Sequence, residues 1–431
     1  RAMVAGNPYF PEGVARWSYA WDSAGRLSSV TYPRRDEGYP TTATYGYDSG
    51  FLTSVNATFQ DPFSWGPVGS VAATLDYDAS GRVRSTSVST SAQSGAAFQV
   101  VADRDSAGLA RPGSWRFFRR NGGQLTEHEL RAYSYDPSGN ISAISSTLGL
   151  PLTYRYDARG RLISDSISGR GFNPETREYD GFGNLVKIVG ASSTSLTTTW
   201  STNRLSSSLA LYDGAGRMTE DKARSIGRDY YPDGALTAEY SHLPGSNATL
   251  YPGGISVWLA DGKAENALAF WGDSVSCEAE QFRSLVRDEN AQILTEYNGE
   301  TESPCVCSTP CVWRDRFYRD VVRLGPWATA SYTRGTGIRL EARDHLGTPR
   351  FVTNATGSIL STVILDSFGQ SVSGSPATRE AFTGHERNHI SGDGNQLPLS
   401  DYMHARTYVP MLGRFTRPDP IDSFTVFNPQ S

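Results

Sequence analysis

A short segment near the end of the sequence has residue types and spacing that could support metal chemistry. His385, Glu386 and His389 have the H-E-x-x-H spacing of zinc proteases. That chemistry needs both histidines on one face of a helix and a third ligand beyond them. Here Phe-Thr-Gly precedes the motif and Ile-Ser-Gly-Asp-Gly follows it, so any helix would end within a turn. We therefore predict no zinc protease site, and no metal ion or other cofactor.

The four cysteines of the chain form a second group that could do chemistry: Cys277, Cys305, Cys307 and Cys311. Four cysteines allow three disulfide pairings, and an exported location would favour their oxidation. Four free thiols, or a tetrahedral zinc site, remain alternatives. The spacing alone does not decide between them.

Composition and charge exclude several classes of protein. The 431 residues include 40 Lys+Arg against 45 Asp+Glu, a net charge of −5, so no overall basic field attracts nucleic acid or anionic lipid. No stretch approaches the ~18 consecutive apolar residues of a membrane span. The 43 Gly, 22 Tyr and 9 Trp against 4 Met indicate short strands joined by tight turns, and exclude an all-helical fold. The chain lacks an initiator Met, so we expect it to be part of a longer protein.

A short motif recurs in the first half of the chain. An aromatic residue and Asp are followed by two residues, Gly, Arg or Asn, and then an aliphatic residue or Met. The Asp is expected to open a turn by accepting hydrogen bonds from amides two or three residues on, and the Gly supplies a positive φ. The clear copies have their aromatic residue, Asp and Gly at Tyr19, Asp22 and Gly25; Tyr77, Asp78 and Gly81; Tyr135, Asp136 and Gly139; Tyr156, Asp157 and Gly160; Tyr179, Asp180 and Gly183; and Tyr212, Asp213 and Gly216.

Each copy of the motif predicts one β-hairpin. The residue after Arg or Asn starts the return strand, with its apolar side chain beside the aromatic residues of the first strand. An isolated hairpin is marginal in water, whereas successive hairpins can pair edge to edge into one sheet. Each turn offers one carboxylate, whereas the sites of a calcium-binding coil need several oxygen ligands. The sequence therefore predicts an extended hairpin array and not a calcium coil.

These repeats resemble the YD repeats of bacterial Rhs proteins, of the C component of insecticidal toxin complexes and of animal teneurins. A second series strengthens the resemblance, because residues 344–350 (DHLGTPR) are similar to the start of the Rhs repeat-associated core domain. The strings at 365–369, 382–387, 401–406 and 412–420 follow in that family's order. The resemblance covers residues 19–240 and 341–420.

The resemblance implies a β-sheet wound into a hollow shell that encloses a variable C-terminal toxin. In family members, aspartates in two DPxG-like motifs cut the toxin from the shell. Asp419 matches the first motif, although Asp422 stands where Gly is usual. The second motif is missing before Ser431, and a carboxylate cleaves a peptide bond only with its partner, so this chain alone is not expected to cleave itself. Arg414 and Arg417 either orient Asp419 or are solvated turn arginines.

The resemblance also implies partners and a location. The partners are the protein's own C-terminal toxin, which is missing from this chain, and a secretion or delivery machinery. The location is secreted or cell-surface, in a bacterium. A structural shell that delivers a toxin is therefore the leading functional hypothesis. The alternatives are an adhesion or glycan-binding module, whose exposed aromatic residues would stack on sugars, and a self-cleaving aspartyl peptidase centred on Asp419.

The repeats predict an all-β fold, and the resemblance implies that the YD hairpins form a spiral sheet around a hollow shell. We also expect one short inserted helix. Phe282, Leu285, Val286 and Ile293 have helical spacing and mark that helix. We expect a repeat shell at 1–255, a cysteine-containing insertion with the helix at 256–340, and a truncated core domain at 341–431. About 35 strands spaced ~4.8 Å apart would give a path on the order of 170 Å, roughly one circuit of a barrel.

Overall fold

The structure of the protein is a computed structural model that describes residues 2–6, 14–34, 39–64, 66–107, 111–149, 151–167, 174–190, 193–199, 201–230, 236–241, 251–258, 264–268, 282–288, 292–301, 313–373, 380–392, 395–403 and 406–418. Within these ranges the chain forms 37 strands and two short 3-10 helices, so the predicted all-β fold is confirmed. In every sheet, each strand pairs with its neighbours in the sequence. The chain is thus a succession of antiparallel hairpins.

The first 24 strands form what we call the first circuit. Its largest sheet contains 16 strands in sequence order, and smaller sheets of two and six strands continue it. The strands are β1 Ala2–Gly6, β2 Val14–Trp21, β3 Leu27–Arg34, β4 Thr42–Asp48, β5 Phe51–Gln60, β6 Pro67–Tyr77, β7 Val83–Thr90, β8 Ala96–Arg104, β9 Pro112–Asn121, β10 Gln124–Tyr135, β11 Ile141–Ser146, β12 Leu152–Tyr156, β13 Leu162–Ile167, β14 Glu175–Tyr179, β15 Leu185–Val189, β16 Ser193–Ser195, β17 Thr198–Thr199, β18 Arg204–Leu205, β19 Ala210–Tyr212, β20 Met218–Asp221, β21 Ile226–Tyr230, β22 Leu236–Ser241, β23 Tyr251–Trp258 and β24 Ala264–Leu268.

The remaining strands form the second circuit. It begins with a seven-stranded sheet and ends with sheets of two and four strands. Its elements are β25 Phe282–Arg287, β26 Ile293–Thr301, β27 Trp313–Arg323, β28 Ala328–Thr333, β29 Gly337–Arg343, β30 Pro349–Asn354, β31 Ile359–Thr362, β32 Ile364–Leu365, β33 Ser371–Ser373, η1 Phe382–Gly384, β34 Glu386–Gly392, β35 Asn395–Met403, β36 Arg406–Val409, η2 Pro410–Leu412 and β37 Arg414–Phe415.

Alternating side chains explain how the first circuit buries one face. On β5, Val55, Ala57 and Phe59 are at most 1% exposed, while the residues between them are more accessible. Side chains two residues apart share one face of a strand, so this face carries the apolar residues. On β28, all six residues are buried, because both faces of this strand are covered. The core therefore lies between the two circuits.

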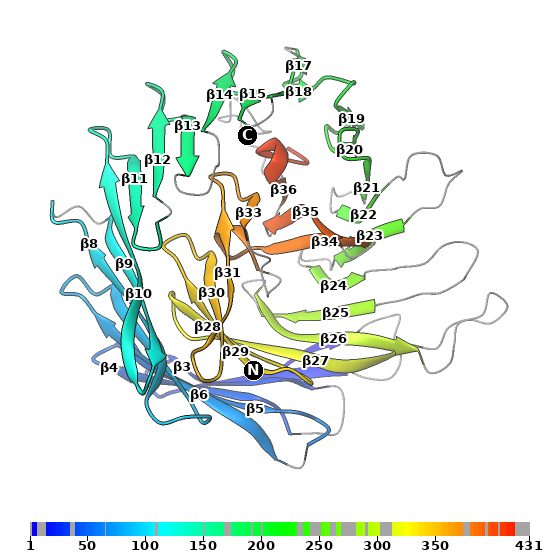
Figure 1. Ribbon diagram of the computed structural model, residues 1–431. Helices are drawn as coiled ribbons and strands as arrows, with labels where there is room; N and C mark the ends of the chain where they lie inside the picture. Colours follow the sequence, from blue (N-terminus) through cyan, green and yellow to red (C-terminus); the bar gives the residue numbers. More distant parts are fainter. Residues whose placement is uncertain are drawn as a thin grey trace.

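The second circuit lies against the concave side of the first (Figure 1). The yellow strands β27–β31 lie inside the blue and cyan strands β3–β10, and the orange β34 and β35 lie inside the green strands. Contacting residues are 289 positions apart where the Tyr32 hydroxyl donates to Val321 O, and 202 positions apart where Ser367 donates to Asp165. The sequence separation between contacting residues decreases along the chain, because the inner circuit needs fewer residues than the outer circuit to cover the same arc. The chain is therefore a spiral that tightens inward, and it makes more than the single circuit expected from strand spacing.

The predicted inserted helix is wrong. Its residues form the antiparallel hairpin of β25 and β26, in which Leu285 pairs with Glu296 and Arg287 with Ile293. Leu285 and Val286 are both buried, at 1% and 3% exposure, so the apolar residues are consecutive because both faces of the strand are covered. Such a short apolar run does not distinguish a buried strand from a helix by periodicity.

The seven-stranded sheet β25–β31 runs across the expected boundary between residues 340 and 341, which falls within β29. Within the described ranges, no helix has the length and apolar character needed to cross a membrane.

Candidate functional site

The repeat turns share one hairpin geometry. At Asp22, carboxylate Oδ1 accepts hydrogen bonds from the backbone N–H groups of Ala24 and Arg26, both at 2.9 Å. The N–H of Gly25 donates to Asp22 O at 3.0 Å, and Gly25 has a φ of 75°. This geometry matches the expected acceptor role of Asp, with partners two and four residues on rather than two or three. The same bond to the N–H four residues on is made by Asp78, Asp136, Asp157, Asp180 and Asp213.

The residue after the turn glycine completes the hydrogen bonding of the aspartate. Nε of Arg161 donates to Asp157 Oδ2 at 2.7 Å. Where the motif has Asn instead, the side-chain amide has this role, as Asn184 Nδ2 donates to Asp180 Oδ2 at 2.7 Å. These bonds favour the ionised carboxylate, so the pKa of Asp157 is lowered, chiefly by its hydrogen bond from Arg161.

Arginine and tyrosine side chains also connect each repeat to the next. The Arg161 guanidinium carbon lies 4.7 Å from the ring centre of Tyr179, in the following repeat. The hydroxyl of Tyr179 donates back to Leu162 O at 2.8 Å. A cation over an aromatic face is attractive, and the hydroxyl bond fixes the distance between the turns. The same stacking is present in the pairs Arg26–Tyr47, Arg111–Tyr135, Arg204–Tyr212 and Arg217–Tyr230.

Replacing Tyr179 with Phe tests this connection. The variant loses only the hydroxyl that donates to Leu162 O. We expect the free energy of unfolding to fall by about 1 kcal/mol, the usual net contribution of such a bond. Chemical denaturation measures the change. Tyr39→Phe is the control, because Tyr39 is 70% exposed, and it should change stability by less than ~0.5 kcal/mol. Equal effects of the two substitutions would contradict the prediction.

The C-terminal strings contain turns of the same kind. Asp344 Oδ1 accepts hydrogen bonds from the N–H groups of Leu346 and Thr348 at 3.0 and 3.1 Å. Asn354 makes the equivalent turn, with bonds from Thr356 and Ser358 at 3.0 Å each. The repeat turn therefore continues into the second circuit, where the surrounding sequence no longer resembles the motif.

Asp366 occupies such a turn in a largely buried position. Its Oδ1 accepts bonds from the N–H groups of Phe368 and Gln370 at 2.9 and 2.8 Å. Burial raises its pKa to about 6, and the nearby charges of Glu175 and Asp165 add to this effect. Folding therefore favours the protonated carboxyl. The resulting stability is present below about pH 4 and is lost as the pH rises towards 6.

We expect Asp366→Asn to stabilise the protein at neutral pH. An amide oxygen can accept the same turn bonds, as Asn354 does, without the cost of burying a charge. At pH 7 the gain should be about 1–3 kcal/mol, and it should disappear towards pH 4. Denaturation curves at pH 4, 5, 6 and 7 measure it. In the control Asp22→Asn, hydrogen bonds from Arg26 lower the pKa of an aspartate that is only partly buried, so no gain is expected at pH 7. An Asp366→Asn variant less stable than wild type at pH 7 would refute the prediction.

Buried ion pairs join the two circuits. Nε and Nη2 of Arg350 on β30 donate to the two carboxylate oxygens of Glu129 on β10, each at 3.0 Å. The two residues are 3% and 0% exposed. Burial would raise the pKa of Glu129, but the charge and hydrogen bonds of Arg350 lower it. Other arginine–carboxylate pairs between the circuits are Arg34–Asp320 and Arg131–Asp344, and pairs within the second circuit are Arg319–Glu296, Arg323–Glu380, Arg343–Glu341, Arg287–Glu386 and Arg387–Asp401.

Arg414, a candidate orienting residue, is buried at 5% exposure. Its Nη1 donates to Asn203 O at 3.0 Å, and its Nη2 to Asn184 Oδ1 at 3.4 Å. Burial lowers the pKa of its guanidinium. The interpretation of Arg414 as a solvated turn arginine is therefore wrong. Its contacts attach the last described strand to turns of the first circuit.

The candidate catalytic residue Asp419 lies outside the described residues. The chain directly before it is held in place, because the N–H of Met218 donates to Thr416 O at 2.7 Å. Arg417 is half-buried in the same segment. An orienting contact between Arg414 and Asp419 stays a prediction.

The segment with zinc protease spacing is not a helix. Glu386 to Gly392 form strand β34, in which the carboxylate of Glu386 accepts a hydrogen bond from Arg287 Nη2 at 2.9 Å. Thr383 Oγ1 lies 2.7 Å from Nδ1 of His385. The described ranges contain no group of three or more His, Cys, Asp or Glu residues placed to hold a metal ion. Cys277, Cys305, Cys307 and Cys311 lie outside the described residues, so their pairing stays open.

Sequence reasoning found the turn residues and missed their connections. The arginine after the turn glycine belongs to the predicted motif, and its recurrence before an aromatic residue of the next repeat is the signal for this contact. The C-terminal strings indicate the family resemblance but not their own contacts. Asp344, Arg350, Arg387 and Asp401 of these strings prove to be partners in buried ion pairs.

The fold defines a class of protein: a shell built from β-hairpins that wind into an inward spiral. Residues 135–171 match the sequence model of a family described as RHS Repeat. This segment therefore contains an RHS repeat, and the resemblance inferred from the Tyr-Asp motifs is confirmed. No curated protein sequence matches the chain.

Several solved structures share this fold. The structure titled "Crystal Structure of TcdB2-TccC3" has a TM-score of 0.74 at 16% identity, covering 97% of this chain and 21% of that chain. The Tc holotoxin pore of Photorhabdus luminescens has a TM-score of 0.71 at 15% identity, covering 97% of this chain and 20% of that chain. A TcdB2-TccC3 structure without its hypervariable C-terminal region gives 0.72 at 16% identity, with 97% and 21% covered. The chain thus has the fold of an Rhs shell and spans about a fifth of these proteins.

Proposed function

We propose that this chain is the C-terminal part of a secreted or cell-surface Rhs shell that encloses a C-terminal toxin domain and helps to deliver it. The observation that carries this proposal is the position of the second circuit. It lies on the concave side of the first circuit, so the wall of the wound sheet has two layers there (Figure 1). The buried Arg350–Glu129 pair and the contact of Trp115 Nε1 with Arg343 O at 2.9 Å hold it there. A lining of this kind would separate an enclosed domain from the solvent.

The repeat tyrosines offer little support for glycan binding as the function. Stacking on a sugar needs a free aromatic face. The rings of Tyr47, Tyr135 and Tyr179 each have an arginine over one face, and their hydroxyls donate to backbone carbonyls. In the shell proposal, these tyrosines have a structural role, because they connect neighbouring repeats of the wall.

We also propose that Asp419 takes part in release of the enclosed domain. The support is the fixed position of the residues directly before it, through Arg414 and Thr416. As Asp419 is one carboxylate, it needs a second acid or base from downstream residues to cleave a peptide bond.

The test uses the parent protein with its native downstream residues, as wild type and as Asp419→Asn. Intact mass and gel analysis should give two fragments that stay associated for the wild type, and one uncut chain for the variant. Limited proteolysis then tests enclosure separately, since the downstream domain should be digested more slowly in the uncut parent than as a free domain. Equal digestion rates would overturn the shell proposal, and cleavage unaffected by Asp419→Asn would overturn the role of Asp419.

A further inference from the structure

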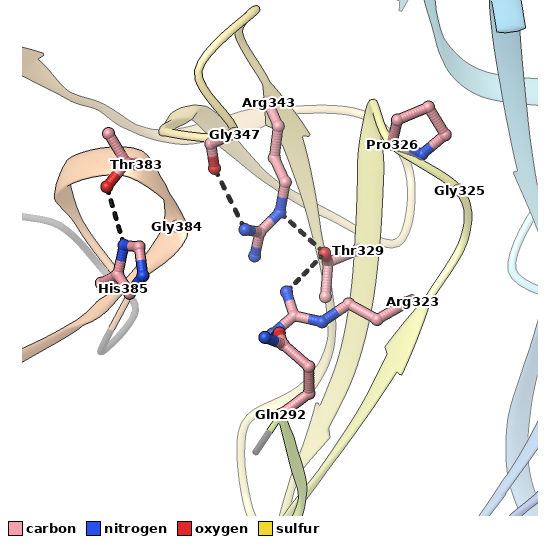
Figure 2. Close-up of a pocket in the computed structure, with 10 residues that line it drawn as sticks. All are labelled: Gln292, Arg323, Gly325, Pro326, Thr329, Arg343, Gly347, Thr383, Gly384 and His385. Carbon is pink, nitrogen blue, oxygen red and sulfur yellow. Dashed lines mark hydrogen bonds between the residues drawn. The ribbon is translucent and has the colours of Figure 1, made fainter. Parts of the chain in front are cut away.

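A polar pocket lies within the second circuit, between the β27–β29 strands and the loop around η1. It has a volume of about 260 Å³. Figure 2 shows the side chains of Arg323, Arg343, Thr329 and Gln292 on one side, and those of Thr383 and His385 on the other. The residues come from sequence positions 292 to 385, so only the folded second circuit brings them together.

Thr329 lies where the two arginines meet. Its Oγ1 accepts hydrogen bonds from Arg343 Nε at 2.8 Å and from Arg323 Nη1 at 3.2 Å (Figure 2). Both lone pairs of the hydroxyl are thereby used, and its own proton has no acceptor among the residues that the structure describes. Thr329 is 1% exposed, so this unsatisfied donor is a buried one.

Other hydrogen-bond donors at the pocket also lack acceptors. Gln292 Oε1 accepts a bond from Arg323 Nη2 at 2.7 Å, which leaves its amide nitrogen without a partner in the described ranges. Nη1 of Arg343 donates one hydrogen to Gly347 O at 3.1 Å and has a second to give. Nε of Arg323 is buried and makes no hydrogen bond. The lining thus presents more N–H and O–H groups than it can satisfy.

The nearby carboxylates face away from this excess. Glu380 accepts bonds from Arg323 Nη1 at 2.8 Å, from Arg323 Nη2 at 2.5 Å and from Arg343 Nη2. Glu341 accepts from Arg343 Nη2 at 2.7 Å. Neither carboxylate lines the pocket. The acids therefore anchor both guanidinium groups from behind. The four Nη hydrogens of Arg323 all have acceptors, whereas Nη1 of Arg343 keeps one hydrogen. This charged N–H, with the Thr329 hydroxyl and the Gln292 amide, suits a planar or tetrahedral anion.

We propose that this pocket binds a small oxyanion or a carboxylate group. The volume supports a small ligand, since drug-sized molecules occupy pockets of roughly 300–1,000 Å³. Such a ligand supplies the acceptors that the lining lacks, and Arg343 offers it a charged N–H donor. A free inorganic anion and the carboxylate of an organic molecule share this chemistry. The proposal does not depend on the shell function.

The test is titration calorimetry of the full chain with sodium sulfate and, separately, with sodium acetate. Sodium chloride keeps the ionic strength constant. We expect saturable binding of at least one of the two anions. Sulfate alone would indicate a tetrahedral oxyanion, and acetate alone would indicate a carboxylate. Absence of saturable binding for both anions would overturn the proposal.

Gln292→Glu identifies the pocket as the site. The new carboxylate keeps a partner in Arg323, whose Nη2 lies 2.7 Å from Gln292 Oε1, so the fold should be preserved. It also places a negative charge in the pocket, so the dissociation constant should rise by about tenfold or more. Gln124→Glu is the matched control, because Gln124 is exposed at the start of β10, and it should bind as wild type. Thr329→Val is a second variant that removes the unsatisfied hydroxyl and should weaken binding. If the Gln292→Glu variant binds as tightly as wild type, the pocket is not the site.

Discussion

Replacing Arg350 with Met is expected to lower the free energy of unfolding by about 3–5 kcal/mol. The substitution leaves the fully buried Glu129 carboxylate without the bidentate partner whose two nitrogens lie 3.0 Å from its oxygens. A buried charge without a partner is far more costly than the pair is stabilising. The remaining partners, Ser146 Oγ at 2.7 Å and the more distant Arg131 Nε at 3.7 Å, cannot replace the bidentate pair. Denaturant titration measures the loss.

Two further variants separate the ion pair from simple packing. In the double variant Glu129→Leu with Arg350→Met, both charges are removed, so most of the lost stability should return. Lys187→Met is the control for an exposed pair, since Lys187 and Glu178 are 41% and 59% exposed, and its effect should stay below about 1 kcal/mol. If Arg350→Met costs no more than this control, the pair does not hold the circuits together.

Phe117→Ala should be similarly destabilising, by about 3–5 kcal/mol. Phe117 on β9 is 0% exposed, and its ring centre lies 4.5 Å from that of Phe351 on β30. The substitution leaves a cavity between the two circuits that rigid strands on both sides cannot fill. Hydrogen exchange provides a second measurement, because amides of β30 should lose protection before those of β5.

The neighbouring residue supplies the matched control for this prediction. Phe118 follows Phe117 on β9, points to the opposite face and is only partly buried. Phe118→Ala should therefore cost about 1 kcal/mol. Equal losses for the two phenylalanines would mean that the contact between the circuits contributes little beyond ordinary strand packing.

Sequence reasoning predicted the features that depend on neighbouring residues. The turn at Asp22 needs only the amides of Ala24 and Arg26 and a glycine with positive φ, all within five positions. A repeated hairpin then implies a meander, because each strand pairs with the next. The all-β class and the extended sheet follow from these local interactions, whereas the winding of the sheet is what the family resemblance implies.

The interactions between the circuits could not be predicted in the same way. Glu129 and Arg350 are 221 positions apart, and no local pattern identifies which residues of the outer wall meet which residues of the inner one. Two-sided burial also removes the alternation that identifies a strand, which is why Leu285 and Val286 resembled a helix. The burial of Arg414 could not be predicted for the same reason, since its partner Asn203 belongs to the other circuit.

The inward spiral has a consequence for folding during synthesis. The ribosome makes β1–β24 before β25, so the outer wall emerges while the strands that will cover its concave side do not yet exist. Val55, Phe59 and Phe117, each 0% exposed in the finished protein, would then face solvent. Exposed apolar surface of this kind favours aggregation and chaperone binding in nascent chains. A ribosome-bound chain that stops before β25 should therefore recruit chaperones strongly, and one that extends beyond β31 should recruit them much less.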